Sequence, residues 1–166
     1  VSNLFYQTNA ENDINVIDMV RNVSKYIGTK LAVYKNYTKK IHTNLHIHLT
    51  FGNIGTGKIY NDYWKVKFYI TDGVNSKVFQ SMFDLKEIPI AIMPNSPNWR
   101  NTKAIIEDID VTEYGSIRAF MTIEDIDEIY ENMYLSNTSN FLNRIDLETV
   151  NPSWHGYGYE IYNVVE

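Results

Sequence analysis

One short stretch in the first third of the chain holds two sets of residues that could do chemistry. Gly52, Gly57 and Lys58 have the G-x-x-x-x-G-K spacing of a loop that binds phosphate groups through its backbone amides. His46 and His48 are two residues apart, so on a strand both imidazoles would point to the same side, as in a paired-histidine metal site. The stretch therefore suggests a phosphate site or a metal site.

The phosphate interpretation requires a particular structural context. A phosphate-binding loop of this kind precedes a helix whose N-terminus receives the phosphates, and a Ser or Thr follows the lysine to hold magnesium. Here Ile59 follows Lys58, and the residues beyond it alternate between apolar and polar as a strand does. We therefore predict a hairpin loop between two strands, in which the glycines supply positive φ angles.

The three residues 46–48, His-Ile-His, also resemble the His-hydrophobe-His motif of rolling-circle replication initiators and relaxases. The resemblance implies a divalent metal held by the histidines and a nucleophilic tyrosine on a downstream helix with a lysine nearby. Tyr130 and Tyr134 are the candidate tyrosines, but no lysine occurs after Lys103. We therefore expect no metal and no cofactor, and we interpret the histidines as the solvated face of a strand. A metal-dependent nucleic-acid enzyme that uses the two histidines stays open as an alternative.

Charged residues are distributed unevenly along the chain, whose formal net charge is −5. Residues 21–77 hold ten Lys and Arg against two acids, whereas residues 78–166 hold five Lys and Arg against fifteen acids. Such a segregation bears on partners and association rather than on the fold. We expect a basic surface that binds a partner, formed by Arg21, Lys25, Lys35, Lys39, Lys40, Lys65 and Lys67.

The acidic residues are densest between Glu107 and Glu131, where nine acids accompany a single base. A calcium-binding loop would need a glycine at its sixth place, but counting from Asp108 the glycine, Gly115, is the eighth residue. We therefore expect a negative surface that contacts a basic partner or imitates the phosphates of a nucleic acid. Its predicted residues are Glu107, Asp108, Asp110, Glu124, Asp125, Asp127, Glu128 and Glu131.

Two helices are predicted from capping residues and helical spacing. Thr8 and Glu11 have capping-box spacing, and apolar residues then recur at helical intervals as far as Ile27. A second helix is predicted near residues 122–135, where Thr122 is the N-cap. Its apolar stripe would consist of Ile126, Ile129, Tyr130, Met133 and Tyr134.

Strands are predicted where the hydrophobic period becomes two. Ile41, Leu45, Ile47, Leu49 and Phe51 should share the buried face of the first long strand. Further strands are expected over residues 31–34, 64–70, 78–83, 88–93, 103–111, 117–123 and 159–165. A hairpin turn is predicted at residues 72–73, and the strands at 103–111 and 117–123 should pair with each other around residues 113–116. The predicted fold is a single α+β domain, residues 1–166, with a mainly antiparallel sheet built from hairpins.

Composition excludes several classes of site. The chain has no cysteine, which excludes disulfides and thiolate-bound metals. No run of 18 apolar residues and no signal-peptide pattern is present, so we expect neither a membrane span nor secretion. Frequent Asn, Ile, Lys and Tyr suggest an AT-rich coding genome, as in a low-GC bacterium or one of its viruses.

Residues 18–20 (Asp-Met-Val), Lys25, Gly28 and Tyr34 trace a helix–glycine–strand opening. Over about residues 8–34 this opening resembles phage neck, tail-terminator and head–tail connector proteins. The resemblance implies a small α+β subunit repeated in a ring between the capsid and the tail. Opposite charges on two sides of one subunit would suit such head-to-tail contacts.

We therefore predict a non-enzymatic bacteriophage assembly or connector component, located in the virion or the host cytoplasm. Its partners would be copies of itself or other virion proteins, joined by charge complementarity. The alternative is an acidic anti-defence or immunity-type inhibitor that blocks a basic nucleic-acid-binding partner. Nucleic-acid binding through residues 35–40 ranks behind both, because the whole chain is acidic.

Overall fold

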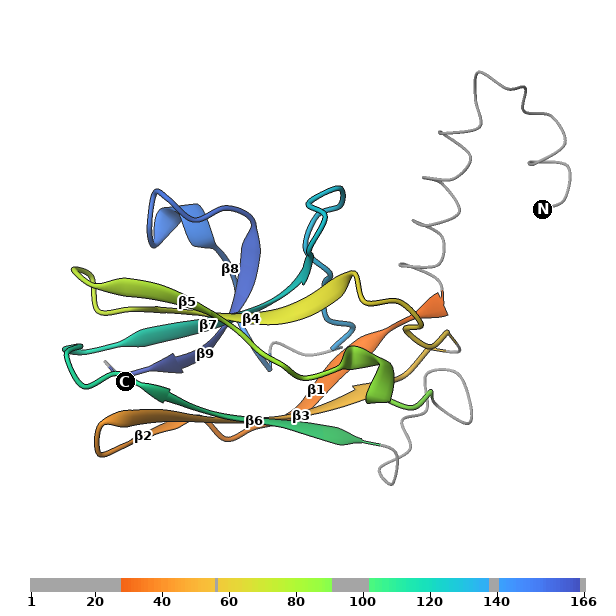
Figure 1. Ribbon diagram of the computed structural model, residues 1–166, viewed down its shortest axis with the longest axis horizontal. Helices are drawn as coiled ribbons and strands as arrows, with labels where there is room; N and C mark the ends of the chain where they lie inside the picture. The colour runs from red at the N-terminus through yellow and green to blue at the C-terminus, as the bar shows by residue number, and fades with distance from the viewer. Residues whose placement is uncertain (1–27, 56, 91–101, 138–140, 165–166) are drawn as a thin grey trace, which may run out of the picture.

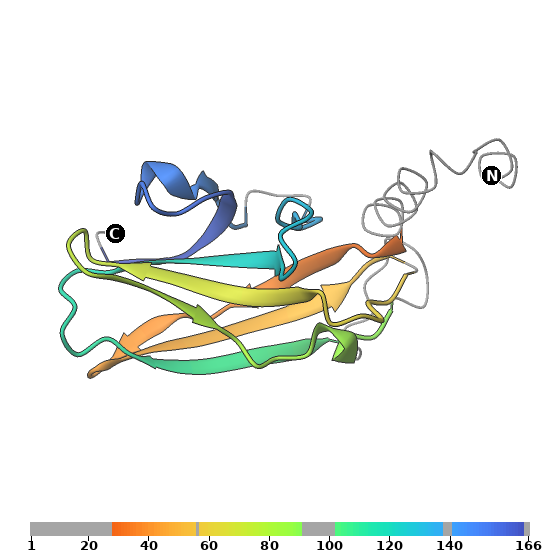
Figure 2. The ribbon, with the colours of Figure 1, turned by 45° about the horizontal axis from the view of Figure 1, so that its top comes forward.

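The computed structural model describes residues 28–55, 57–90, 102–137 and 141–164. Within these residues nine strands form two antiparallel sheets that pack face to face (Figures 1 and 2). Strands make up 48% of the described residues, and none of their helical segments reaches seven residues. The described part of the chain is therefore an all-β sandwich, and the predicted α+β class is wrong.

The first sheet has four strands arranged around β3 (Asn44–Asn53). Strand β6 (Lys103–Asp110) pairs with β3 along one side, from the pair Asn44–Asp110 to the pair Phe51–Lys103. The other side of β3 is shared by β1 (Leu31–Asn36) and β2 (Lys39–Ile41). Every strand of this sheet is thus held in place by β3.

The second sheet has five strands in the order β5, β4, β7, β9, β8. Its central strand β7 pairs with β4 over eight consecutive residues and with β9 on its other side. The strand bounds are β4 (Trp64–Thr71), β5 (Ser76–Gln80), β7 (Arg118–Asp125), β8 (Arg144–Asp146) and β9 (Tyr157–Asn163).

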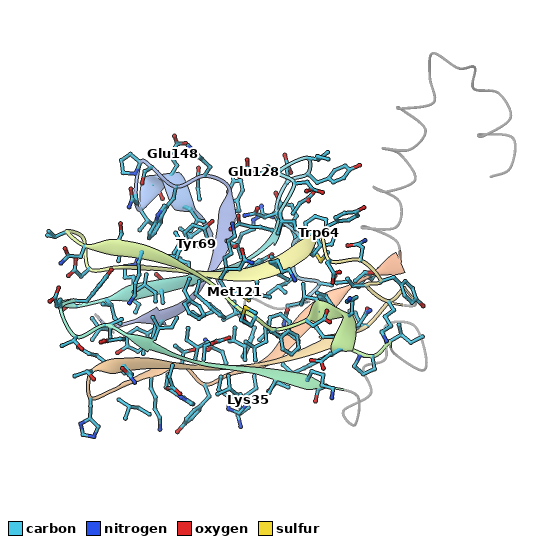
Figure 3. The ribbon with its side chains drawn as sticks, in the orientation of Figure 1. Lys35, Trp64, Tyr69, Met121, Glu128 and Glu148 are labelled. Atoms are coloured by element: carbon cyan, nitrogen blue, oxygen red, sulfur yellow. The ribbon has the colours of Figure 1, made fainter. Side chains whose placement is uncertain are left out.

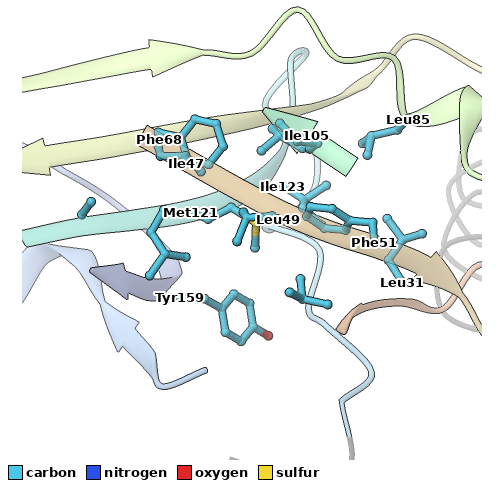
Figure 4. Close-up of a cluster of buried hydrophobic side chains, with 14 of the residues drawn as sticks. Leu31, Ile47, Leu49, Phe51, Phe68, Leu85, Ile105, Met121, Ile123 and Tyr159 are labelled. Carbon is cyan, nitrogen blue, oxygen red and sulfur yellow. The ribbon is translucent and has the colours of Figure 1, made fainter. Parts of the chain in front are cut away.

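The main core lies between the two sheets, as Figure 4 shows. Because side chains alternate across a strand, every second residue of β3 and β4 points inward and is buried. This confirms the inward residues predicted for the first long strand except Ile41, which is 41% exposed. Ile41 ends the separate strand β2, and a tight turn at His42 (φ 53°) reverses the chain before β3.

A smaller cluster covers the outer face of the five-stranded sheet. The segment after β8, including the short 3-10 helix η5 (Leu147–Thr149), lies over that face (Figure 1). The ring of Trp154 meets the rings of Tyr69 and Phe120 edge to face, at centroid distances of 5.1 and 6.4 Å. Leu147 completes the buried cluster. One sheet face is therefore covered by the chain itself, whereas the described residues put no comparable cover over the outer face of the other sheet.

The predicted helix over residues 122–135 does not form. Thr122 to Asp125 belong to β7, and residues 126–137 make an irregular loop in which Ile126 and Ile129 are 46% and 59% exposed. The residues that would have begun the helix are instead paired with β4 as the end of strand β7. The helix predicted from Thr8 to Ile27 lies outside the described residues. No helix in the described ranges is long and apolar enough to cross a membrane.

Two predicted hairpins are instead connections between the sheets. Strands β3 and β4 belong to different sheets, as do β6 and β7, so the loops near residues 54–63 and 111–117 cross the sandwich. The glycines of the first loop do not supply positive φ angles; they allow the backbone of the loop to approach the backbone of Gly28 closely. A Cβ on Gly55 would lie 2.5 Å from the carbonyl oxygen of Gly28, and one on Gly57 would lie 2.5 Å from the carbonyl carbon of Gly28.

The remaining strand predictions are mostly confirmed. Strands form close to the predicted ranges at 31–34, 64–70, 103–111, 117–123 and 159–165, and Gly73 (φ 93°) makes the predicted β4–β5 hairpin turn. The strand predicted at 78–83 ends at Gln80. Residues 88–90 follow the 3-10 helix η3 (Leu85–Glu87) without forming a strand, and residues 91–93 lie outside the described ranges.

Candidate functional site

The two histidines of the sequence motif lie on the outer face of the four-stranded sheet. His46 is paired in register with Asp108, and its Nδ1 lies 2.9 Å from the Asp108 carboxylate. His48 is paired in register with Ile106, an apolar residue that is 57% exposed. Within the described parts of the chain, no three His, Asp or Glu side chains gather closely enough to hold a metal ion. The geometry therefore gives these histidines one carboxylate partner and no third ligand.

Beside the histidines, Lys35, Tyr37 and Lys39 form an exposed group that we call the lysine–tyrosine surface. The Lys39 ammonium lies 4.7 Å from the centre of the Tyr37 ring, and the Lys35 ammonium lies 5.8 Å from it. Lys39 also donates a hydrogen bond to the Tyr37 hydroxyl at 3.3 Å. The register aligns Lys39 with His46, so this surface adjoins the histidines.

The other predicted basic residues do not join the lysine–tyrosine surface. Lys65 and Lys67 lie on β4 in the opposite sheet, and the Lys67 ammonium is 3.3 Å from the Glu124 carboxylate. Lys40 is exposed on β2 at a register position opposite the buried Leu45. Arg21 and Lys25 lie outside the described residues. The basic half of the sequence is thus divided between both sides of the sandwich.

The predicted acidic residues are divided in the same way. Asp108 and Asp110 lie on β6 at exposed positions, and Glu107 accepts a hydrogen bond from Ser81 at 2.8 Å. Glu124 and Asp125 end β7 in the other sheet, where Asp125 is buried. The loop that follows β7 carries three exposed acids, Asp127, Glu128 and Glu131.

The acids at and after the end of β7 surround a cavity of about 360 Å³, which we call the acidic pocket. The pocket is lined by acidic residues, by tyrosines and by residues just before β9. The lining residues are Glu124, Asp125, Glu128, Tyr130, Glu131, Asn132, Tyr134, His155, Gly156 and Tyr157.

The loop that forms the acidic pocket is fixed at both ends. Met133 is buried, and its amide donates to the Ile123 carbonyl at 2.8 Å. The Asn132 side chain donates to the Tyr157 carbonyl at 2.9 Å, and the Leu135 amide donates to the Tyr159 hydroxyl at 2.8 Å. These contacts hold the loop against β9, so the pocket is built by two segments that lie far apart in the sequence.

Glu124 is held in the pocket by three neighbouring side chains. It accepts hydrogen bonds from the hydroxyls of Tyr69 and Thr122, and it also pairs with Lys67. Burial of the Tyr69 hydroxyl, together with the neighbouring Glu124 carboxylate, raises the pKa of Tyr69 above its usual value. The side chain of Glu124 is therefore engaged with its own sheet, while Glu128 and Glu131 are exposed at the pocket.

Nothing in the sequence pattern connects the tyrosines and the histidine of this pocket with its acids. Tyr130 and Tyr134 are predicted on a helix, as part of its apolar stripe and as candidate nucleophiles, and His155 and Tyr157 have no predicted role. The only local signal was the high density of aromatic residues after Trp154. Comparison of the chain with models of known protein families and with characterised protein sequences finds no match.

Proposed function

We propose that this chain is a non-enzymatic assembly component of a bacteriophage, whose copies bind one another head to tail through surfaces of opposite charge. The lysine–tyrosine surface would contact the acidic pocket of the next copy. The observation that carries the proposal is the position of these surfaces: Lys35 projects from one side of the sandwich and Glu128 from the other (Figure 3). Two different surfaces on opposite sides make chains or rings rather than a two-fold dimer.

The sandwich between the surfaces suits such a role. Both surfaces are attached to one continuous core, so the angle between successive copies would be fixed by the fold. The ladders between them carry mixed charges, such as the pair Lys67–Glu124 and the pair Arg118–Glu160 at 2.6 Å. Each of these pairs joins one base to one acid within the five-stranded sheet, so neither pair adds net charge to that sheet.

The resemblance of residues 8–34 to connector proteins supports the bacteriophage part of the proposal. Gly28 and Tyr34, two of the residues that carry this resemblance, lie among the described residues. In this proposal the chain assembles in the host cytoplasm and remains in the virion. The acidic-inhibitor alternative stays a prediction, but the geometry does not favour it. Asp108 lies on the four-stranded sheet, whereas Glu128 follows the end of β7 in the five-stranded sheet. One basic channel of a partner would therefore not cover all of the predicted acidic residues.

Light scattering coupled to size exclusion tests the proposal. At a chain concentration of about 100 µM, we expect oligomers in about 50 mM NaCl that dissociate in about 500 mM NaCl, because salt screens exposed charge pairs. The substitutions Lys35→Gln and Lys39→Gln in one variant, and Glu128→Gln and Glu131→Gln in another, should each give monomers.

Mixing the two variants distinguishes head-to-tail contact from general stickiness. Each variant keeps one intact surface, so a one-to-one mixture should form a heterodimer and stop there. A wild-type protein that is monomeric at both salt concentrations would overturn the proposal. So would a mixture that stays monomeric although wild type assembles.

Single-stranded nucleic acid is a second candidate for the lysine–tyrosine surface, because an exposed aromatic ring beside two cations suits base stacking and phosphate contact. Fluorescence anisotropy with a labelled oligonucleotide should then show binding that weakens in the Lys35→Gln, Lys39→Gln variant. Binding should be unchanged in the Glu128→Gln, Glu131→Gln variant. Absence of any binding at low salt would eliminate this candidate.

A further inference from the structure

The acidic pocket has aromatic walls as well as acids, which is a more specific arrangement than a negative patch. Tyr130, Tyr134 and Tyr157 line the cavity together with Glu128 and Glu131. Aromatic faces attract cations through the quadrupole of the ring, and carboxylates attract the same cations through their charge. Both kinds of wall therefore select the same class of ligand.

The chain itself shows which group these tyrosines hold. The guanidinium of Arg144 lies 4.6 Å from the centre of the Tyr134 ring and 5.1 Å from that of the Tyr157 ring. Both tyrosines are also part of the pocket lining, whereas Arg144 is not. One cation is thus already stacked on the two rings at the border of the cavity.

The acids that line the pocket differ in their exposure and in their contacts, and Glu131 accepts a hydrogen bond from the Tyr134 hydroxyl at 3.5 Å. Glu124 is engaged with Lys67 and with two hydroxyls. Glu128 is exposed, and its left-handed backbone (φ 55°) lies in the loop that Asn132 attaches to β9. An anchored loop places the Glu128 and Glu131 carboxylates at the pocket before a ligand arrives, which lowers the entropic cost of binding.

We propose that the acidic pocket is a receptor for one basic side chain, arginine or lysine, of a partner protein, with tyrosine faces and the Glu128 and Glu131 carboxylates around the cation. This inference rests on the proposed function, because it names the chemistry by which the pocket would receive the next subunit. It also stands apart from assembly, since a free amino-acid derivative suffices to test it.

The test uses the full chain with ¹³C-labelled tyrosine rings, observed by NMR during titration with three probes. The probes are the N-acetyl amides of arginine, lysine and citrulline, of which citrulline is the neutral isostere of arginine. The Lys35→Gln, Lys39→Gln variant is used throughout, which removes competing self-association. We expect saturable shifts of the Tyr130, Tyr134 and Tyr157 signals with arginine or lysine and none with citrulline.

Three variants locate the binding. Glu128→Gln with Glu131→Gln should weaken binding by about tenfold or more, because the charge is removed without a change of shape. Glu148→Gln is the matched control: this exposed acid lies on the same side of the sandwich, outside the pocket (Figure 3), and its loss should leave binding unchanged. Arg144→Gln should tighten binding, because it removes a like charge and frees two ring faces.

The arginine and lysine arms decide which basic side chain the pocket prefers. Equal shifts with citrulline, or binding that survives the Glu128→Gln, Glu131→Gln change, would overturn the inference. Assembly that passes the mixing test while the probes fail to bind would leave the proposed function standing and this inference refuted. Probe binding without assembly under any condition would support this inference and refute the proposed function.

Discussion

At the scale of single residues, one half-buried carboxylate links two loops at the same end of the sandwich. Asp72 lies in the β4–β5 turn and accepts hydrogen bonds from the amides of Val74 at 2.8 Å and Asn75 at 2.6 Å. It also accepts one at 2.9 Å from Gly115, which belongs to the connection between β6 and β7. The Gly115, Asn75 and Val74 amides hold the pKa of Asp72 well below its usual value of 3.8.

Because the pKa of Asp72 is lowered in the folded state, its contribution to stability is present above about pH 4 and is lost as pH falls further. Asp72→Asn should therefore lower the unfolding midpoint in urea at neutral pH. It should also reduce the loss of stability between about pH 4 and pH 2. Denaturation curves at a series of pH values measure both effects.

The matched control for this prediction is Asp127→Asn, which changes an exposed acid of another loop. Curves for Asp72→Asn that run parallel to those of the wild type over the whole pH range would contradict the assigned role of the carboxylate.

At the scale of elements, the connection between β3 and β4 depends on close contact between backbones. The amide of Gly57 donates to the Gly28 carbonyl, and the Asn53 side chain donates to the Gly57 carbonyl at 2.7 Å. The Thr29 hydroxyl donates to the same carbonyl at 2.9 Å. This network fixes the point where the chain leaves one sheet for the other, so the glycine spacing that imitates a phosphate loop has a structural cause.

Gly57→Ala should destabilise the fold by roughly 1–3 kcal/mol, because the added methyl group would overlap the backbone of Gly28 and force the two segments apart. Thermal unfolding measures the loss. Gly115→Ala is the control, since its Cβ would meet only the Asp72 carboxylate, at an ordinary distance of 3.8 Å. Equal stability of the two variants would refute the close-approach explanation.

At the scale of the whole molecule, the sandwich is completed by a third layer on one side only. Trp154, together with Leu147, covers Tyr69 and Phe120 on the outer face of the five-stranded sheet. The described residues put no comparable cover over Lys35, Tyr37 and the histidines on the other sheet. The molecule is therefore asymmetric in architecture, and its uncovered sheet face is the one proposed to meet a neighbour.

Trp154→Ala should lower the free energy of unfolding by about 3 kcal/mol, because it removes a buried aromatic side chain and opens a cavity above β4 and β7. Urea denaturation followed by tyrosine and tryptophan fluorescence measures the change. Tyr60→Ala removes a ring that is 81% exposed and should have almost no effect. Equal effects of the two substitutions would show that the third layer adds little stability.

The charge pattern shows how the fold changes the meaning of a sequence feature. Basic residues of β3 and β4 are separated by many positions from the acids of β6 and β7, yet antiparallel pairing places these strands side by side. His46 consequently meets Asp108, and Lys67 meets Glu124. The predicted basic and acidic surfaces are therefore not fully separated, because acids lie beside bases in both sheets.

The sequence by itself determined which residues of β3 are buried. Alternation in β3 and β4, and the turn at Gly73, are consequences of local backbone geometry, so they can be predicted without knowledge of the pairing partners. The outward position of His46 and His48 follows from the same alternation.

Only the tertiary structure decided which strands pair, and therefore which charges meet. The helical spacing after Thr122 was real, but eight residue pairs between β7 and β4 involve long-range hydrogen bonds that no local pattern reveals. The acidic pocket likewise combines the loop after β7 with His155 and Tyr157 before and within β9. Local periodicity specifies the face of a side chain, whereas its neighbours depend on the packing of segments distant in the sequence.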